Sequence, residues 1–106
     1  MTLLINTADH ELVEVALIDQ KKVLASQVFA APRSQSELLL PAVDKLLKRQ
    51  GVDLKDLQRI RVADQGGSFT SLRIGILTAN ALAYALDIPI ETVSQQKPKR
   101  KGGLMV

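Results

Sequence analysis

Residues 64–87, DQGGSFTSLRIGILTANALAYALD, contain a glycine loop that leads into a long apolar segment. The pattern predicts a helix from about Thr70 to Leu86, and this segment has no charged residue between Arg73 and Asp87. On a helical wheel its apolar side chains fall on two opposite sides, separated by narrow polar seams. A helix that is apolar all round is typically buried all round, so this helix needs a second cover besides a sheet.

One side of this helix has a row of small residues at i, i+4 spacing, formed by Ser71, Gly75, Ala79 and Ala83. Small side chains allow two helix backbones to approach closely. An exposed apolar side of this size is typical of a protein–protein interface. We therefore predict that the row is a partner interface. The alternative is that the first helix and the chain ends cover the second apolar side.

The rest of the chain contains one further segment with helical periodicity and several short segments with the composition of β-strands. Residues 34–50 predict the first helix, which begins with the Ser34/Glu37 capping-box pattern and ends before Gly51. Its apolar face is formed by Leu39, Leu40, Ala42, Val43, Leu46 and Leu47. Short apolar and β-branched runs predict five strands at residues 3–8, 12–18, 22–30, 59–63 and 90–93. The order βββ-α-β-α-β predicts an α/β fold with a mixed five-stranded sheet and flanking helices.

The positive charge of the chain is concentrated near its end. The 106 residues include 14 Lys and Arg against 11 Asp and Glu, and four of the cations are Lys97, Lys99, Arg100 and Lys101. Residues 1–94 are therefore predicted to form one nearly neutral domain, followed by a flexible basic tail at 95–106. The tail is a candidate contact for nucleic-acid phosphates, but it has no aromatic residue for base stacking. A solubilising terminus is the alternative.

Composition excludes several kinds of site. Because the chain has no Cys and only one His, His10, it offers no disulfide, thiolate zinc site or histidine metal cluster. It has neither an unbroken apolar run of about 18 residues nor a signal-peptide pattern, so we expect a cytoplasmic protein with no membrane contact. Asn6, Asp9 and Asp64 are predicted near strand ends, but without a nearby base their expected role is capping or solvation. We therefore expect no catalytic residues, metal or cofactor.

The glycine loop itself allows two interpretations. Gly66, Gly67 and Ser68 lie between a predicted strand and a helix N-terminus, which is a candidate anion or phosphate site. The loop does not match the P-loop or Gly-x-Gly-x-x-Gly patterns. We prefer the interpretation that the glycines allow a tight turn and that Ser68 or Thr70 caps the helix.

Residues 65–75, QGGSFTSLRIG, continued by 78–89, TANALAYALDIP, resemble the signature Gly-Pro-Gly-Ser-Phe-Thr-Gly-Leu-Arg-Ile-Gly of the TsaB (YeaZ) family. Two further segments resemble family motifs: LINT at 4–7 and QSELLLP at 35–41. The resemblance covers about residues 1–94. Asn6 and the pair Gln65-Gly66 depart from the family pattern, and we expect a one-lobe version of the family because the basic tail stands where a second lobe usually begins.

The resemblance implies an actin-like ATPase lobe with a ribonuclease-H-like sheet. It also implies a noncatalytic scaffold in the synthesis of threonylcarbamoyladenosine in tRNA, which pairs through its two long helices with a TsaD-like catalytic subunit. A TsaE-like ATPase is a further implied partner, and the tail is a candidate tRNA contact. Carried onto this chain, the interface comprises Leu39, Val43, Ser71, Gly75, Ala79 and Ala83. The alternatives are a self-dimerising paralogue with another role, a tRNA-binding module driven by the tail, and a small ATP-dependent transferase.

Overall fold

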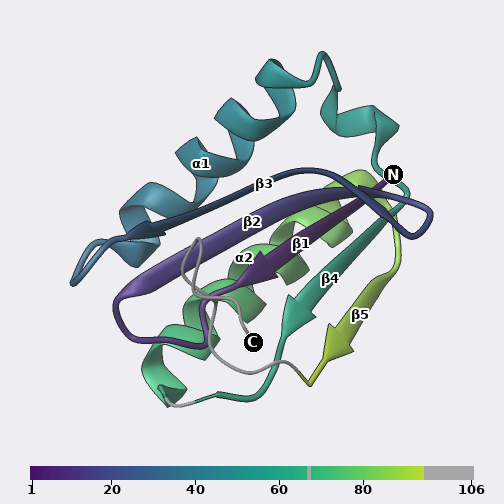
Figure 1. The fold of residues 1–106 in the computed structure, drawn as a ribbon. Helices are drawn as coiled ribbons and strands as arrows, with labels where there is room; N and C mark the ends of the chain where they lie inside the picture. The colour runs from purple at the N-terminus through teal and green to yellow at the C-terminus, as the bar shows by residue number, and fades with distance from the viewer. Residues whose placement is uncertain (67, 95–106) are drawn as a thin grey trace.

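A computed structural model describes residues 1–66 and 68–94 of the chain. Three strands, β1 (Thr2–Asn6), β2 (Leu12–Asp19) and β3 (Lys22–Ala30), form an antiparallel meander. Two later strands, β4 (Arg59–Ala63) and β5 (Ile90–Val93), run parallel to β1. The sheet order is β3-β2-β1-β4-β5 (Figure 1). The mixed five-stranded sheet predicted from the sequence is confirmed.

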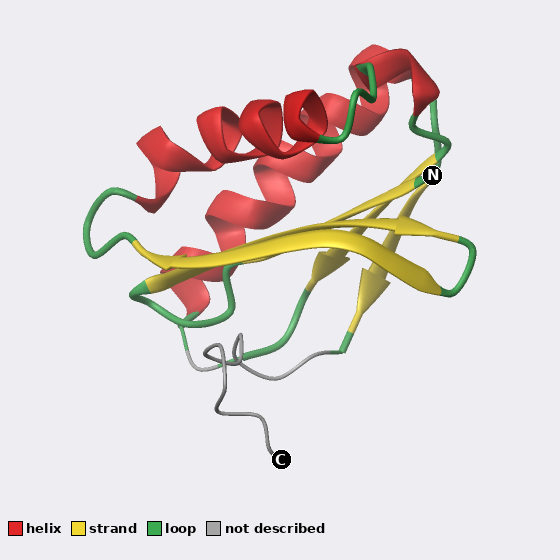
Figure 2. Ribbon diagram, turned by 45° about the horizontal axis from the view of Figure 1, so that its top comes forward, coloured by secondary structure: helices red, strands yellow, loops and turns green. Residues whose placement is uncertain are grey.

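Two long helices, α1 (Gln35–Arg49) and α2 (Phe69–Leu86), lie on the same face of the sheet (Figure 2). The first packs on β2 and β3, and the second packs on β1, β4 and β5. A single 3-10 turn, η1 (Leu54–Asp56), leads from α1 toward β4. It is capped through the Asp53 amide, which donates to Asp56 Oδ2 at 3.0 Å. The result is two layers with the apolar core between them.

The core is formed by the side chains that alternate toward the helices. On β1 these are Leu3 and Ile5, both completely buried, and on β2 they are Val13, Val15 and Leu17. From α1, Leu39 and Leu46 enter the same cluster. The glycine at 75 brings α2 close to β1, because a Cβ there would lie 2.6 Å from Thr7 Oγ1. Gly75 therefore lies on the side of α2 that meets the sheet.

The start of α1 differs from the predicted capping box. Ser34 occupies the N-cap position, but its side chain makes no capping hydrogen bond, and its ψ of 13° is far from the extended value of a typical N-cap. Its backbone groups are used instead: the carbonyl accepts from the Leu38 amide at 3.0 Å, and the amide donates to the Ala31 carbonyl at 3.0 Å. The next residue, Gln35, is buried and anchors the helix start through its carboxamide. The helix continues through Pro41.

Leu40 is a second departure from the sequence prediction. The helical pattern predicts Leu40 on the apolar core face of α1, yet this residue is 51% exposed. The other five members of that face are buried. Leu40 stands at the border of the apolar face, and in the folded chain this border turns toward α2 and solvent rather than toward the sheet.

By length and composition, α2 could cross a membrane, with a mean hydropathy of 1.2 over 18 residues. Its structural role accounts for this composition. Ser71, Leu72, Gly75, Ala79 and Ala83 are buried against the rest of the domain. A core helix of a globular domain passes the same test, so the apolar character of α2 is explained by packing on one side only. Its other side requires a separate explanation.

Candidate functional site

The six residues predicted to form the partner interface lie in the interior of the domain. Leu39, Val43, Ser71, Ala79 and Ala83 are each at most 5% exposed, and Gly75 is also buried. The small-residue row packs onto the sheet, where the short side chains allow α2 to approach β1. The prediction that this row is an exposed interface is therefore wrong for the folded domain. The row does serve close packing, but against a sheet rather than a partner helix.

The opposite side of α2 is exposed and largely apolar, with Arg73 and Asn80 as exposed polar residues along it. Leu77 is 62% exposed and Tyr84 is 90% exposed. Together with α1, this side forms an open groove of about 320 Å³ lined by Leu40, Leu77, Thr78, Ala81 and Leu82. We call Leu40, Leu77, Ala81 and Tyr84 the outer helix face; Leu82 also lines the groove but packs partly against the core. The helical wheel separates the two apolar sides of α2, but it does not identify which side packs on the sheet.

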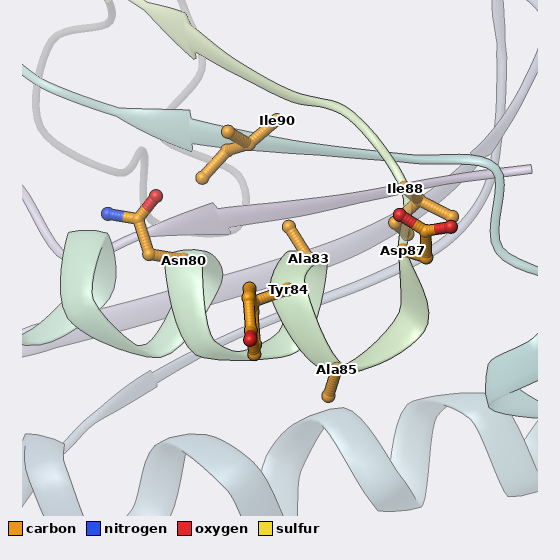
Figure 3. Close-up of a pocket in the computed structure, with 7 residues that line it drawn as sticks. All are labelled: Asn80, Ala83, Tyr84, Ala85, Asp87, Ile88 and Ile90. Atoms are coloured by element: carbon orange, nitrogen blue, oxygen red, sulfur yellow. The ribbon is translucent and has the colours of Figure 1, made fainter.

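A second hollow lies at the end of α2, beside β5 (Figure 3). It is open and measures about 680 Å³, and it is lined by Asn80, Ala83, Tyr84, Ala85, Asp87, Ile88 and Ile90. In the close-up, Ala83 is directed at the sheet and Ala85 away from it. Tyr84 projects from the outer side of the helix, so its ring extends the outer helix face toward this hollow. Large exposed aromatic side chains of this kind are typical anchors of protein interfaces.

The glycine loop serves the local fold in the part that the structure describes. Ser68 caps α2, with its Oγ accepting from the Ser71 amide at 3.2 Å. A Cβ on Gly66 would lie 2.4 Å from the Ala8 Cβ, so this glycine permits the loop to pass closely over the β1–β2 connection. Gly67 lies outside the described residues. The capping role predicted for Ser68 is confirmed, whereas the anion role of this loop stays a prediction.

Of the three polar residues predicted near strand ends, Asn6 and Asp9 make structural hydrogen bonds, whereas Asp64 has a buried oxygen without a described partner. Asn6 donates from Nδ2 to Glu14 Oε1 at 3.1 Å, and its Oδ1 accepts from the Ala8 amide at 3.0 Å. Asp9 Oδ1 accepts from the Glu11 amide at 2.8 Å. Asp64 has one buried oxygen, Oδ1, without a partner among the described residues. Within residues 1–66 and 68–94 no group of three potential metal ligands occurs.

Lys97, Lys99, Arg100 and Lys101, the candidate tRNA contacts, lie outside the described residues. The structure therefore adds no geometry to this prediction. The candidate site of the described domain is the outer helix face.

Comparison with known proteins agrees with the fold and the motifs. The profile of the family described as "TsaD: tRNA N6-adenosine threonylcarbamoyltransferase" matches residues 22–97. The chain is 39% identical over 95 residues to the tRNA threonylcarbamoyladenosine biosynthesis protein TsaB of Bacillus subtilis. The aligned region covers 89% of this chain and 41% of that protein. It is also 38% identical over 64 residues to the tRNA N6-adenosine threonylcarbamoyltransferase of Geotalea uraniireducens, 60% of this chain and 19% of that protein.

A solved structure of YeaZ from Pseudomonas aeruginosa superimposes with a TM-score of 0.80 at 35% sequence identity. The match covers 88% of this chain and 43% of that chain, so the chain spans about two fifths of the length of these TsaB and YeaZ relatives. The shared sheet order and the two helices on one face give the actin-like, ribonuclease-H-like lobe that the resemblance implied. The chain belongs to the TsaB (YeaZ) family and corresponds to its N-terminal lobe.

Proposed function

We propose that this chain is a noncatalytic subunit in the synthesis of threonylcarbamoyladenosine in tRNA, and that it binds a TsaD-like catalytic subunit through the outer helix face. The pathway is supported by the relatives that are named tRNA threonylcarbamoyladenosine biosynthesis protein TsaB. The observation that supports the binding surface is the exposure of Leu40, Leu77 and Tyr84 on two adjacent helices.

The chemistry of the outer helix face fits a protein partner. The groove between α1 and α2 is lined by three leucines, an alanine and a threonine, with no charged side chain. Burying an exposed leucine contributes roughly 2 kcal/mol. Tyr84 adds a large side chain that loses little conformational entropy on binding. A surface of this composition is typical of the centre of an interface, where charged residues are depleted.

The noncatalytic part of the proposal is supported by the hydrogen bonds at the strand ends. The carboxamide of Asn6 is held by Glu14 and by the Ala8 amide, and Asp9 holds the Glu11 amide. These groups stabilise the connection from β1 to β2. A carboxamide is also a weaker magnesium ligand than a carboxylate, so position 6 is poorly suited to holding a metal–nucleotide complex.

The proposed partner has a related lobe. Proteins named tRNA N6-adenosine threonylcarbamoyltransferase are 33–38% identical to this chain over 60 to 64 residues. Two related lobes can pack their helix pairs against each other with approximate two-fold symmetry, which would bury the outer helix face in a four-helix arrangement. This arrangement requires no change in the sheet-facing side of α2.

The test is co-purification of the full chain with the TsaD protein of the same organism. Leu77→Glu and Leu40→Glu place a charge in the groove and are expected to abolish the complex while leaving the circular-dichroism spectrum unchanged. Leu54→Glu is the matched control, since Leu54 is 43% exposed but lies in η1, away from the groove. If both groove variants still bind TsaD as the unmodified chain does, the proposed surface is wrong.

A second copy of the chain is an alternative partner, because a two-fold axis can bring the same apolar surface of two copies into contact. Sedimentation of the chain alone, followed by addition of TsaD, separates the two cases. A dimer that never exchanges with TsaD favours the self-dimerising alternative. The TsaE-like partner and the tRNA contact of the tail remain parts of the proposal, and deletion of 97–106 tests the tail through the loss of RNA affinity.

A further inference from the structure

A second surface, separate from the outer helix face, lies along the free edge of the sheet. β3 pairs with β2 and has no neighbour on its other side among the described residues. The Ala31 amide donates to the Glu11 carbonyl, and Leu12 lies opposite Ala30. Because bonded and non-bonded pairs alternate in an antiparallel ladder, the peptide groups of Ser26, Val28 and Ala30 face away from β2. They are available to another strand.

The two halves of this edge differ in protection. Near the β2–β3 turn, Lys21, Lys22 and a register irregularity at Leu17/Ile18 discourage further pairing. From Ser26 to Ala30 the register with β2 is regular, and no charged side chain occurs. An exposed regular edge without charges is a natural template for another strand. The second half of β3 is therefore the part open to pairing.

A pocket lies directly beside this half of the edge, between β3 and α1. It measures about 290 Å³ and is lined by Gln27 and Phe29 from β3 and by Leu38, Pro41, Ala42 and Lys45 from α1. Strands in a sheet lie about 4.8 Å apart, and alternate side chains point to the same face. A strand added to β3 would therefore project every second side chain toward this pocket.

Two groups in the pocket define the chemistry of an occupant. Gln27 Oε1 is buried and has no hydrogen-bond partner among the described residues, which is a costly arrangement unless a donor is supplied. Lys45 is exposed, and none of the ion pairs among the described residues includes it. An occupant that fits both groups carries a side-chain N–H or O–H donor and a carboxylate.

We propose that the Ser26–Ala30 edge of β3 binds an extended acidic peptide segment of another protein as a sixth strand, with a donor side chain directed at Gln27 Oε1 and a carboxylate near Lys45. Recognition of this kind combines main-chain hydrogen bonds with pockets for alternate side chains. A second copy of the chain fits less well, because two β3 strands paired about a two-fold axis would bring two Lys45 ammonium groups to the same face of the joint sheet.

The test uses the full chain and a fluorescein-labelled heptapeptide, Val-Asn-Val-Glu-Val-Asn-Val, measured by fluorescence anisotropy. Val28→Pro removes an N–H that points away from β2, so the fold is retained while a bond to the peptide is lost. We expect about a tenfold weaker Kd. Val28→Thr keeps the N–H and is expected to bind like the unmodified chain.

Two further variants address the side chains. Gln27→Leu is expected to weaken binding about tenfold without loss of thermal stability, since it removes a buried acceptor that has no partner. Lys45→Glu is expected to weaken binding of the Glu peptide more than binding of the same peptide with Gln in place of Glu. These variants keep the proposal testable even where Val28→Pro disturbs the strand.

Three results would overturn this inference: no binding at millimolar peptide, equal binding by all the variants, or a β3-dependent dimer of the chain that excludes the peptide. The inference is independent of the TsaD interface. Leu77→Glu is expected to leave peptide binding unchanged, so failure of either proposal is distinguishable from failure of the other.

Discussion

The hydroxyl of Ser71 donates a hydrogen bond to the side-chain carbonyl of Gln35, with Oγ and Oε1 2.6 Å apart. This bond joins the first turn of α2 to the first turn of α1 inside the domain. The amide of the same Gln35 side chain donates to the backbone carbonyls of Asp9 and Leu12, at 2.7 and 2.9 Å. One buried carboxamide therefore connects both helices to the β1–β2 connection.

Gln35→Leu is expected to destabilise the domain by about 3 kcal/mol, because it leaves a buried hydroxyl and two carbonyls without their partner. Ser71→Ala removes one group of this network and is expected to cost about 1 kcal/mol. Urea unfolding followed by circular dichroism measures both. Ser36→Ala, in an exposed position of the same helical turn, is the control. A Gln35→Leu protein as stable as this control would contradict the role of the network.

Gly75→Ala is expected to destabilise the domain by about 2 kcal/mol, although Gly to Ala normally stabilises a helix. The new Cβ would lie 2.6 Å from Thr7 Oγ1 and 3.4 Å from Ile5 Cγ2. Combining it with Thr7→Ala removes the closest atom, so the two changes should cost less together than the sum of their separate effects. Additive losses in a double-mutant cycle would show that the contact is not the cause.

Tyr84→Ala should leave the stability of the chain within about 0.5 kcal/mol of the original, because the side chain is 90% exposed. If the outer helix face binds TsaD, the same change should weaken that complex about tenfold or more. Calorimetric titration with TsaD measures the affinity, and thermal unfolding of the free chain measures the stability. Unaltered affinity would remove Tyr84 from the proposed interface.

Asp87→Gly is expected to raise stability by about 0.5 kcal/mol. Asp87 ends α2 in the left-handed region, with φ 56° and ψ 48°, where a Cβ is unfavourable. Asp87→Val should destabilise by more than this gain, since a β-branched residue tolerates that conformation poorly. If the backbone conformation controls the effect, thermal unfolding will show a higher melting temperature for Asp87→Gly and a lower one for Asp87→Val. Shifts of both variants in the same direction would point to the lost carboxylate instead.

Local patterns in the sequence predict most of the fold. The five strands and two helices lie within two residues of their predicted bounds, because alternation and helical periodicity are properties of neighbouring residues. The Ser34/Glu37 capping-box prediction was wrong because tertiary contacts determine how α1 begins. The neighbouring Gln35 turns inward to bond Asp9 and Leu12, and the Ser34 backbone does not adopt the extended N-cap conformation.

The candidate site was less accessible to prediction. The sequence shows that α2 has two apolar sides, and it predicts the small-residue row as a partner interface. It does not show what lies against that row, and the prediction of a partner there was wrong, since the row is buried within the domain. The exposed residues Leu77 and Tyr84 stand on the other side of the same helical wheel, so they could be assigned only after the first side had been placed.

The helices and strands, their order and the family signature could be predicted from the sequence, because each depends on residues close together in the chain. Which side of α2 is buried is known only from the folded structure. Apolar burial is non-directional and would accept either side. The deciding contact is the fit of Gly75 over Thr7 and Ile5, residues that come together only when α2 packs on β1. That fit leaves Leu77, Ala81 and Tyr84 facing outward.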